Sequence, residues 1–481
     1  MRIRLTARLA VLALLGAVPI GAVAQERVCP KPADFAPPPL TFSPPSYIDT
    51  SRAGGEPVSV IGHDGSINVS AHAGTTHVYK NPSAAPGAGD FLVGYANQTL
   101  NWRSTDGGQT WKYVGTLGLP AGPHSLTSTG FSDPDFAIDQ AGKIYNVEID
   151  LANNAVFSSN DDGQSYAIAH PQVAPGDRPW LAALEKDEVF LYINSLPKSF
   201  WRSTDGGITW SLISTSPPFN GDFHPDPRNP NDGLIGPVGT YGAAISADDG
   251  RTWELHYGAN TGSNTGFNGI ATVGIDRAGH IYQAAAGSGE VSFSAFNRDT
   301  KTWGPRVDIP HPAGGDTLWP WIVAGDDGRV AMTWYQTLPG KPDEYYVYAS
   351  YTLNARGTVA QCSDGSTVFI PPQFSTANAS GRMIHKGQIC LQGTICNADL
   401  GEGGDRRLGD FFTINFTHAG EIFIASGDTM LRSPTGGPKP VANPIFIKQS
   451  GGAPLLAKPD RVRPSRCLLD LPVCPPPRAP R

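Results

Sequence analysis

Apolar and polar residues alternate along this chain in a repeated hairpin pattern. Each copy has a polar or proline-containing start, an alternating apolar strand, a turn that usually contains glycine and a second apolar strand, which is typical of a β-hairpin. The clearest copies span residues 56–69, 133–147, 177–193, 267–282, 319–335 and 408–424, and a weaker copy is expected around residues 233–244.

A second repeat falls between these hairpins. Ser-x-Asp-x-Gly-x-Ser/Thr-aromatic occurs at residues 104–111, 159–166, 203–210 and 246–253, and a worn copy at 294–303 keeps only its closing Lys-Thr-Trp. The short Asp side chain can accept hydrogen bonds from N–H groups two or three residues further on, and Gly supplies the positive φ that such a turn requires. The aromatic ring can then pack against a neighbouring sheet. We therefore predict that these aspartates are structural clasps and not catalytic groups.

Together the two repeats predict an all-β fold, a β-propeller of about seven four-stranded blades, with six as the alternative. We expect the propeller to occupy residues 51–450. The Pro-rich segment 25–50 contains strand material near Leu40 that could complete the last sheet and close the ring. The Pro-rich tail 451–481 is expected to wrap the surface.

The amino terminus has the organisation of an export signal. Arg2, Arg4 and Arg8 precede an apolar run at residues 9–20 and small residues at 22–24, so residues 1–24 are predicted to be a cleavable signal peptide. The apolar run is shorter than the roughly 20 residues of a membrane span. We expect a secreted or periplasmic protein without membrane insertion.

The cysteines fit an oxidising compartment. Cys390 and Cys396 suggest a local disulfide, whereas Cys467 and Cys474 are expected to pair with each other or with Cys29, and Cys362 completes the six. Their spacing has no zinc signature, and we expect no metal and no cofactor. The 15 possible connectivities of six cysteines stay open at this point.

Composition narrows the range of partners. Charged residues make up 16% of the chain, 56 Gly and 44 Pro imply many turns and few helices, and the net charge is −7 with a pI near 5.9. These values and the absence of a basic run give no reason to expect nucleic acid. We expect a monomer.

The four boxes resemble those of the Asp-box, or BNR-repeat, propellers of the sialidase-like superfamily, across nearly all of residues 56–424. Residues 177–180, 319–329 and 390–412 also resemble recurring stretches of secreted bacterial BNR-repeat proteins. The resemblance implies a carbohydrate or another extracellular polymer as partner, and a glycoside hydrolase as the leading activity. Working sialidases have an Arg-Ile-Pro element, three arginines around a substrate carboxylate, a Tyr-Glu pair and an acid/base Asp. Here Gly55-Glu56-Pro57 stands at the place of the first element without an arginine, and Tyr241 and Tyr335 are the candidate tyrosines.

The hairpin repeat also predicts a site, because the innermost strands of a propeller begin around one mouth of its central funnel. The residues expected there are Glu56, Asp133, Asp135, Asp177, Arg178, Asn268, Trp319, Trp321, Arg407 and Asp410. Two carboxylates can cleave a glycosidic bond, so we expect the catalytic pair among Asp133, Asp135, Asp177 and Asp410. Arg178 and Arg407 would orient the substrate, and Glu56, Trp319 and Trp321 would line its binding site.

A non-catalytic carbohydrate- or protein-binding propeller is the alternative, because Asp, Arg and Trp at strand starts can also hold blades together. Two further motifs stand apart from either function. Residues 224–227 (His-Pro-Asp-Pro) are expected to form a buried turn and not a metal site. His385 belongs to a long insert that could cover the funnel.

Overall fold

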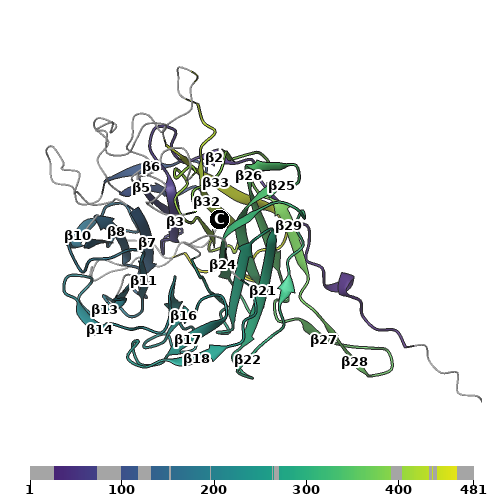
Figure 1. Cartoon of the computed structure of the whole chain (residues 1–481). Helices are drawn as coiled ribbons and strands as arrows, with labels where there is room; N and C mark the ends of the chain where they lie inside the picture. Colours follow the sequence, from purple (N-terminus) through teal and green to yellow (C-terminus); the bar gives the residue numbers. More distant parts are fainter. Residues whose placement is uncertain are drawn as a thin grey trace, which may run out of the picture.

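The computed structural model describes residues 27–72, 99–116, 132–150, 153–194, 197–262, 264, 270–391, 404–432, 436 and 441–462. The expected signal peptide, Asn268, Cys396, Cys467 and Cys474 lie outside these residues. Within them, strands form seven sheets of four or five strands around a central axis, plus one separate hairpin (Figure 1). The prediction of a β-propeller is confirmed, with seven blades.

The blades follow one another along the chain, with the innermost strand first in blades 1 to 6. Blade 1 contains β3 (Gly55–Ile61), β4 (Ile67–His72), β5 (Thr99–Ser104) and β6 (Lys112–Thr116). Blade 2 contains β7 (Ser132–Ile138), β8 (Ile144–Asp150), β9 (Asn153–Ser159) and β10 (Ala167–His170). Blade 3 contains β11 (Pro179–Ala183), β12 (Val189–Ile193), β13 (Ser199–Ser203) and β14 (Ser211–Ser214). Blade 4 contains β15 (His224–Pro225), β16 (Leu234–Pro237), β17 (Gly242–Ser246) and β18 (Glu254–Tyr257).

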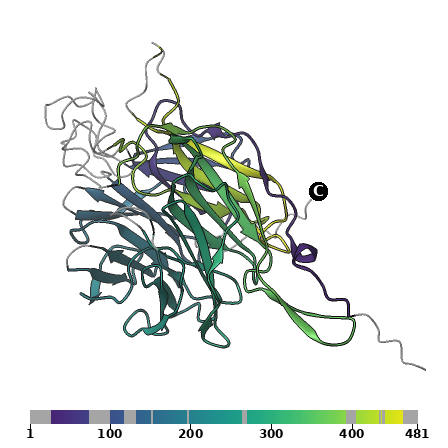
Figure 2. The ribbon, with the colours of Figure 1, turned by 45° about the vertical axis from the view of Figure 1, so that its right-hand side comes forward.

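The later blades carry additional short strands. Blade 5 contains β19 (Gly274–Ile275), β20 (Ile281–Gly287), β21 (Glu290–Asn297), β22 (Thr302–Trp303) and β23 (Val307–Asp308). Blade 6 contains β24 (Thr317–Ala324), β25 (Val330–Leu338), β26 (Lys341–Thr352), β29 (Phe374–Asn378) and β30 (His385–Lys386). The hairpin of β27 (Thr358–Gln361) and β28 (Thr367–Ile370) projects from blade 6 (Figure 2).

Blade 7 contains strands from both ends of the chain and closes the ring. Its strands β31 (Thr413–Phe416), β32 (Ile422–Asp428) and β33 (Asn443–Gly451) are completed by β1 (Thr41–Phe42) and β2 (Ser46–Tyr47), which both pair with β33. Leu40 and Ile48, on either side of these short strands, are buried. The amino-terminal segment is thus part of the last sheet.

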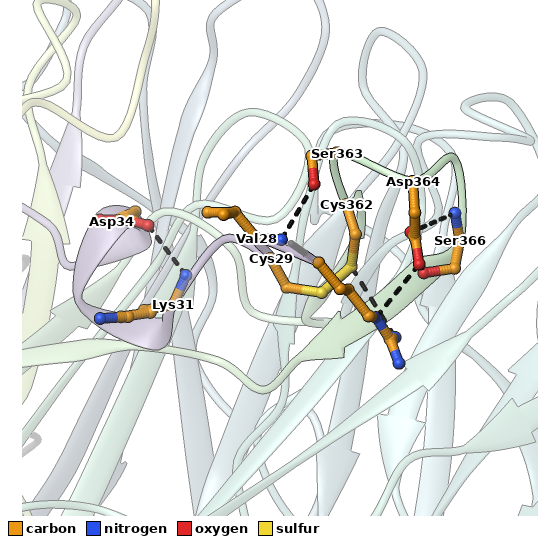
Figure 3. The surroundings of a disulfide bond; sticks show 9 residues. Val28, Cys29, Lys31, Asp34, Cys362, Ser363, Asp364 and Ser366 are labelled. Atoms are coloured by element: carbon orange, nitrogen blue, oxygen red, sulfur yellow. Dashed lines mark hydrogen bonds and ion pairs between the residues drawn. A yellow bond between two sulfur atoms is a disulfide. The ribbon is translucent and has the colours of Figure 1, made fainter. Parts of the chain in front are cut away.

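The segment before β1 is fixed by a disulfide. It contains one turn of 3-10 helix, η1 (Pro32–Phe35), and Cys29 bonds to Cys362 in the β27–β28 turn, 333 residues away (Figure 3). The Val28 N–H donates to Ser363 Oγ at the same place. The predicted option that Cys29 pairs with the carboxy-terminal tail is therefore wrong, because the segment runs along the projecting hairpin of blade 6. Cys390 is also disulfide-bonded.

The Asp-boxes form the turns between the third and fourth strands of blades 1 to 4. In the first box, Asp106 Oδ1 accepts from the Thr110 N–H at 2.9 Å, and Ser104 Oγ accepts from the Gly108 N–H at 2.9 Å. The other three boxes repeat both bonds. Each box also packs on the preceding blade, as Trp111 does against Phe446 of blade 7 with ring centroids 5.3 Å apart. The boxes are therefore local clasps that also fasten successive blades.

Blade 4 departs from the predicted hairpin. Its innermost strand is the two-residue β15 (His224–Pro225), so the segment 233–244 supplies the second and third strands and not the inner hairpin. Proline cannot donate to a strand ladder, and the long turn after Pro225 contains two more prolines. No alternating pattern marks this strand in the sequence.

Candidate active site at the mouth of the ring

Four blades begin their innermost strand with a residue in the left-handed backbone region. Glu56, Asp133, Arg178 and Trp319 have φ of 48°, 48°, 52° and 50°, and each precedes a proline. In blade 7 the corresponding residue is Gly409, with φ of 77°. Residues other than glycine are rare in this region, and such strain gathers at functional sites. The chain therefore keeps three charged residues and one Trp where glycine would relieve the strain.

A β-bulge accompanies this strain in three of these blades. Strand register shifts between Gly55 and Val58, between Ser132 and Asp135, and between Leu318 and Trp321. A bulge changes the direction of the side chains next to it. Here each bulge contains one of the strained residues, Glu56, Asp133 or Trp319.

Buried carboxylates from three blades meet at this mouth. Glu56 is fully buried, and its carboxylate accepts from the Asp133 N–H at 3.1 Å and from the Asp410 N–H at 2.6 Å. His72 Nε2 lies 2.8 Å from Glu56 Oε2. Ser132 Oγ donates to Asp133 Oδ2 at 2.6 Å. Glu56 thus joins blades 1, 2 and 7.

Two arginines compensate this negative charge. Arg406 binds Asp410 with both terminal nitrogens and lies 3.8 Å from Glu56 Oε1. Arg178 is more loosely held, 3.8 Å from Asp410 Oδ2 and 3.9 Å from Asp177 Oδ2. Arg407, which the sequence favoured, pairs instead with Asp405. Arg406 was missed because adjacent arginines cannot be distinguished without the direction of each side chain.

Burial and mutual repulsion raise the pKa of two carboxyl groups at the mouth, those of Glu56 and Asp133. Burial, followed by the charge of Asp410, raises the pKa of Glu56 to about 7, although Arg406 opposes the shift. Burial raises the pKa of Asp133 well above its usual value, and the charges of Glu56, Asp177 and Asp410 add to the effect. The environment of Asp133 therefore favours the protonated form of its carboxyl group.

Three polar atoms at the strained positions have no hydrogen-bond partner among the described residues. They are Asp133 Oδ1, Arg178 Nε and Trp319 Nε1, and all three are buried. A buried polar atom left unpaired costs about 1–3 kcal/mol. A hydroxylated ligand at the mouth could satisfy them.

Aromatic rings form the floor of the mouth. Trp180, Trp321 and Phe411, from blades 3, 6 and 7, lie two residues beyond the strained positions, with ring centroids 5.3–5.7 Å apart. Because blade 3 is not adjacent to blades 6 and 7, these contacts cross the axis. Trp321 therefore lies in the floor and not on an open face of the mouth. Asp135 lies at the same depth and accepts from the Leu181 N–H at 2.7 Å.

The other candidates lie elsewhere. Tyr335 is buried, with its hydroxyl 2.8 Å from Ser426 Oγ, and Tyr241 is 56% exposed and stacks on Tyr257. His385 is fully buried, 2.9 Å from Thr429 Oγ1, and burial lowers its pKa to about 4. Asp177, by contrast, lies at the mouth beside Arg178, and its side chain is 65% exposed.

Within the described ranges, no group of three or more His, Cys, Asp or Glu side chains is arranged to hold a metal ion. The same residues contain no helix long and apolar enough to cross a membrane.

Comparison with known proteins shows what this chain is similar to. The BNR/Asp-box repeat model matches residues 201–212, which cover the third box. A sialidase of Micromonospora viridifaciens is 25% identical over 314 residues, 59% of this chain and 42% of that protein, so the chain spans less than half of its relative.

Solved structures resemble the chain only loosely. A structure of YCF48 bound to D1 peptide has a TM-score of 0.43 at 13% identity and covers 86% of this chain and 97% of its own. An α-L-arabinofuranosidase from Fusarium graminearum has a TM-score of 0.38 at 13% identity, covering 88% and 98%. At these scores the similarity carries no weight for function. The repeated boxes and the closed seven-bladed ring make this chain an Asp-box β-propeller, and its similarity to a sialidase supports describing it as sialidase-like.

Proposed function

We propose that this protein is an exported propeller that binds a glycan at the mouth of the ring and hydrolyses a glycosidic bond there. The observation that supports this most strongly is Asp133, a buried carboxylic acid with a raised pKa. Its Oδ1 has no hydrogen-bond partner in the described part of the chain. A proton donor of this kind is what a glycosidic leaving group requires.

Asp177 is the proposed second carboxylate. It is the most exposed acidic group at the mouth, and its charge is among those that raise the pKa of Asp133. In the reaction, Asp133 protonates the glycosidic oxygen as the bond to the anomeric carbon breaks. Asp177 either takes a proton from the attacking water or forms a glycosyl ester that water then hydrolyses. Arg178 and Trp319 would hold sugar oxygens through side-chain N–H groups that donate no hydrogen bond within the described residues.

The charge pattern favours a neutral glycan over a sialoside. Arg406 is engaged by Asp410, and blade 1 contributes the carboxyl group of Glu56 where a sialidase has an arginine. A substrate carboxylate would therefore meet one loosely paired arginine, Arg178. Fold resemblance alone does not decide the substrate.

A binding propeller without catalysis is the second candidate. The mutual pairing of Glu56, Arg406 and Asp410 supports this candidate. Charges that already neutralise one another can have a purely structural role, which here is to hold blades 1, 2 and 7 together. Such a protein would bind its polymer through the same mouth and release it unchanged.

An activity screen on sialosides and on plant and microbial polysaccharides tests the proposal. On a substrate that is cleaved, Asp133→Asn and Asp177→Asn should each lower kcat by about 10²–10⁴-fold without loss of folded protein. Glu185→Gln, an exposed turn residue, is the control and should leave kcat unchanged. The rate should fall as the pH rises and Asp133 loses its proton. Binding without turnover, weakened in parallel by both variants, would reject the hydrolase in favour of the binding propeller.

A further inference from the structure

A separate cavity of about 350 Å³ lies on the ring axis beneath the aromatic floor. Its walls come from the innermost strands of all seven blades: β3, β7, β11, β15, β19, β24 and β31. It reaches Ile138, Ala324 and Phe416, the last residues of β7, β24 and β31. Since these strands begin at the mouth, the cavity extends toward the opposite face of the ring.

The floor separates this cavity from the mouth. Trp321 contributes to both, whereas Glu56, Asp133, Arg178 and Asp410 do not line the cavity. The packed rings of Trp180, Trp321 and Phe411 stand between the two spaces and are at most 6% exposed. The cavity is therefore a site of its own.

The charged groups of the cavity are mostly acidic. Among its described lining residues, the ionisable ones are Asp135, Asp222 and His224, with no Lys or Arg. Asp135 and Asp222 are 7% and 5% exposed, and His224 Nε2 lies 3.1 Å from Asp222 Oδ2. One histidine faces two carboxyl groups, so the cavity carries a net negative charge whenever both carboxyl groups are ionised.

The pKa shifts of these groups agree with a negative charge that no Lys or Arg of the described lining balances. Burial, and then repulsion from Asp222, raises the pKa of Asp135 well above its usual value. Burial would lower the pKa of His224, but the charge and hydrogen bond of Asp222 outweigh it and raise that pKa. A cation near Asp135 would relieve the repulsion and displace its proton.

We propose that this axial cavity is a second binding site, which takes a small organic cation such as a primary alkylammonium ion. The volume is in the range of small-molecule pockets. Asp135 and Asp222 would pair with the ammonium group, the Trp321 ring offers a cation–π contact, and Phe136 and Phe416 provide apolar surface for the alkyl chain.

The test uses n-butylammonium, with 1-pentanol and butyrate as neutral and anionic analogues of similar size. Calorimetry on the full chain should detect butylammonium at millimolar or lower concentration and neither analogue. The observed enthalpy should depend on the ionisation enthalpy of the buffer, because binding releases the proton of Asp135. Asp135→Asn should weaken binding at least tenfold, and Ala324→Phe, which fills the far end of the cavity, provides a second variant.

Asp177→Asn changes the mouth and should leave butylammonium binding unchanged, so the outcome is independent of the proposed hydrolysis. Equal binding of butylammonium and 1-pentanol would overturn the proposal. Full affinity for butylammonium in both Asp135→Asn and Ala324→Phe would also overturn it. Loss of butylammonium binding in Asp177→Asn would do the same.

Discussion

At the scale of single residues, the backbone at the strand starts carries more information than residue type alone. Sequence patterns placed Glu56, Asp133, Arg178 and Trp319 at these starts, and the structure adds that all four have positive φ. The pattern could not reveal this, because strain depends on neighbouring blades. Gly409 shows the dependence, since a Cβ there would overlap Glu56 Cγ.

Gly409→Ala should destabilise the protein more than its backbone conformation alone explains. The left-handed conformation costs an alanine roughly 1–2 kcal/mol, and the overlap with Glu56 should bring the total to about 3 kcal/mol or more. Gly340→Ala is a matched control, because Gly340 has φ of 75° and nothing within 4 Å of an added Cβ. Denaturant unfolding of both variants measures the difference. Equal losses would show that Glu56 can move aside freely.

The raised pKa of Glu56 predicts a pH-dependent stability. Its folded pKa of about 7 lies above the ordinary 4.5, so its contribution is fully present below pH 4.5 and is lost as the pH rises through 7. The shift corresponds to about 3 kcal/mol. Glu56→Gln has no such titration, and its unfolding free energy should therefore change less between pH 4.5 and 7, although its absolute stability is lower. An identical slope in both proteins would contradict the assignment.

At the scale of elements, local chemistry decided what could be predicted. The Asp-box turns could be predicted because the hydrogen bonds that close each turn lie within one octapeptide. The inner strand of blade 4 could not be predicted, since β15 has only two residues and is recognised only by its pairing with β16. Arg406 illustrates the same limit inside the site: its role follows from contacts with Glu56 and Asp410, which are far from each other in sequence.

Removing one box carboxylate should open one hairpin and leave the rest of the ring intact. Asp205 accepts from the Ile208 and Thr209 N–H groups and from the Thr209 hydroxyl, so Asp205→Ala should cost about 1–2 kcal/mol. Amide hydrogen exchange should accelerate in β13 and β14 and remain unchanged in blade 6. Glu185→Ala, in the exposed turn between β11 and β12, is the control. Faster exchange around the whole ring would mean that the boxes act on global stability instead.

At the scale of the whole molecule, the ring and its seven sheets followed from the repeats, but the long-range disulfide did not. Nothing in the spacing of the cysteines distinguishes Cys362 from four other partners of Cys29, because the pairing depends on where the amino-terminal segment crosses blade 6. The closure by strands could be predicted, since the segment near Leu40 has strand character and an amino-terminal strand can complete the last sheet of a propeller.

Two features fix the amino-terminal segment: the disulfide to the blade 6 hairpin and the strand pairing with blade 7. They should contribute unequally to stability. A disulfide that closes a loop of 333 residues would stabilise by about 6 kcal/mol if the loop were otherwise open. Here β1 and β2 already hold the segment on β33, and the Leu40 N–H donates to Ser375 Oγ, so the disulfide removes little further chain entropy. A Cys29→Ser/Cys362→Ser double variant should therefore lose only about 1 kcal/mol. Deleting residues 27–48 removes the strands as well and should lower the unfolding midpoint by a much larger amount, because β33 then exposes its edge and blade 7 loses its strand pairing with the amino-terminal segment. Thermal unfolding of both variants compares the two, and an equal loss would show that the disulfide, and not strand pairing, keeps the propeller closed.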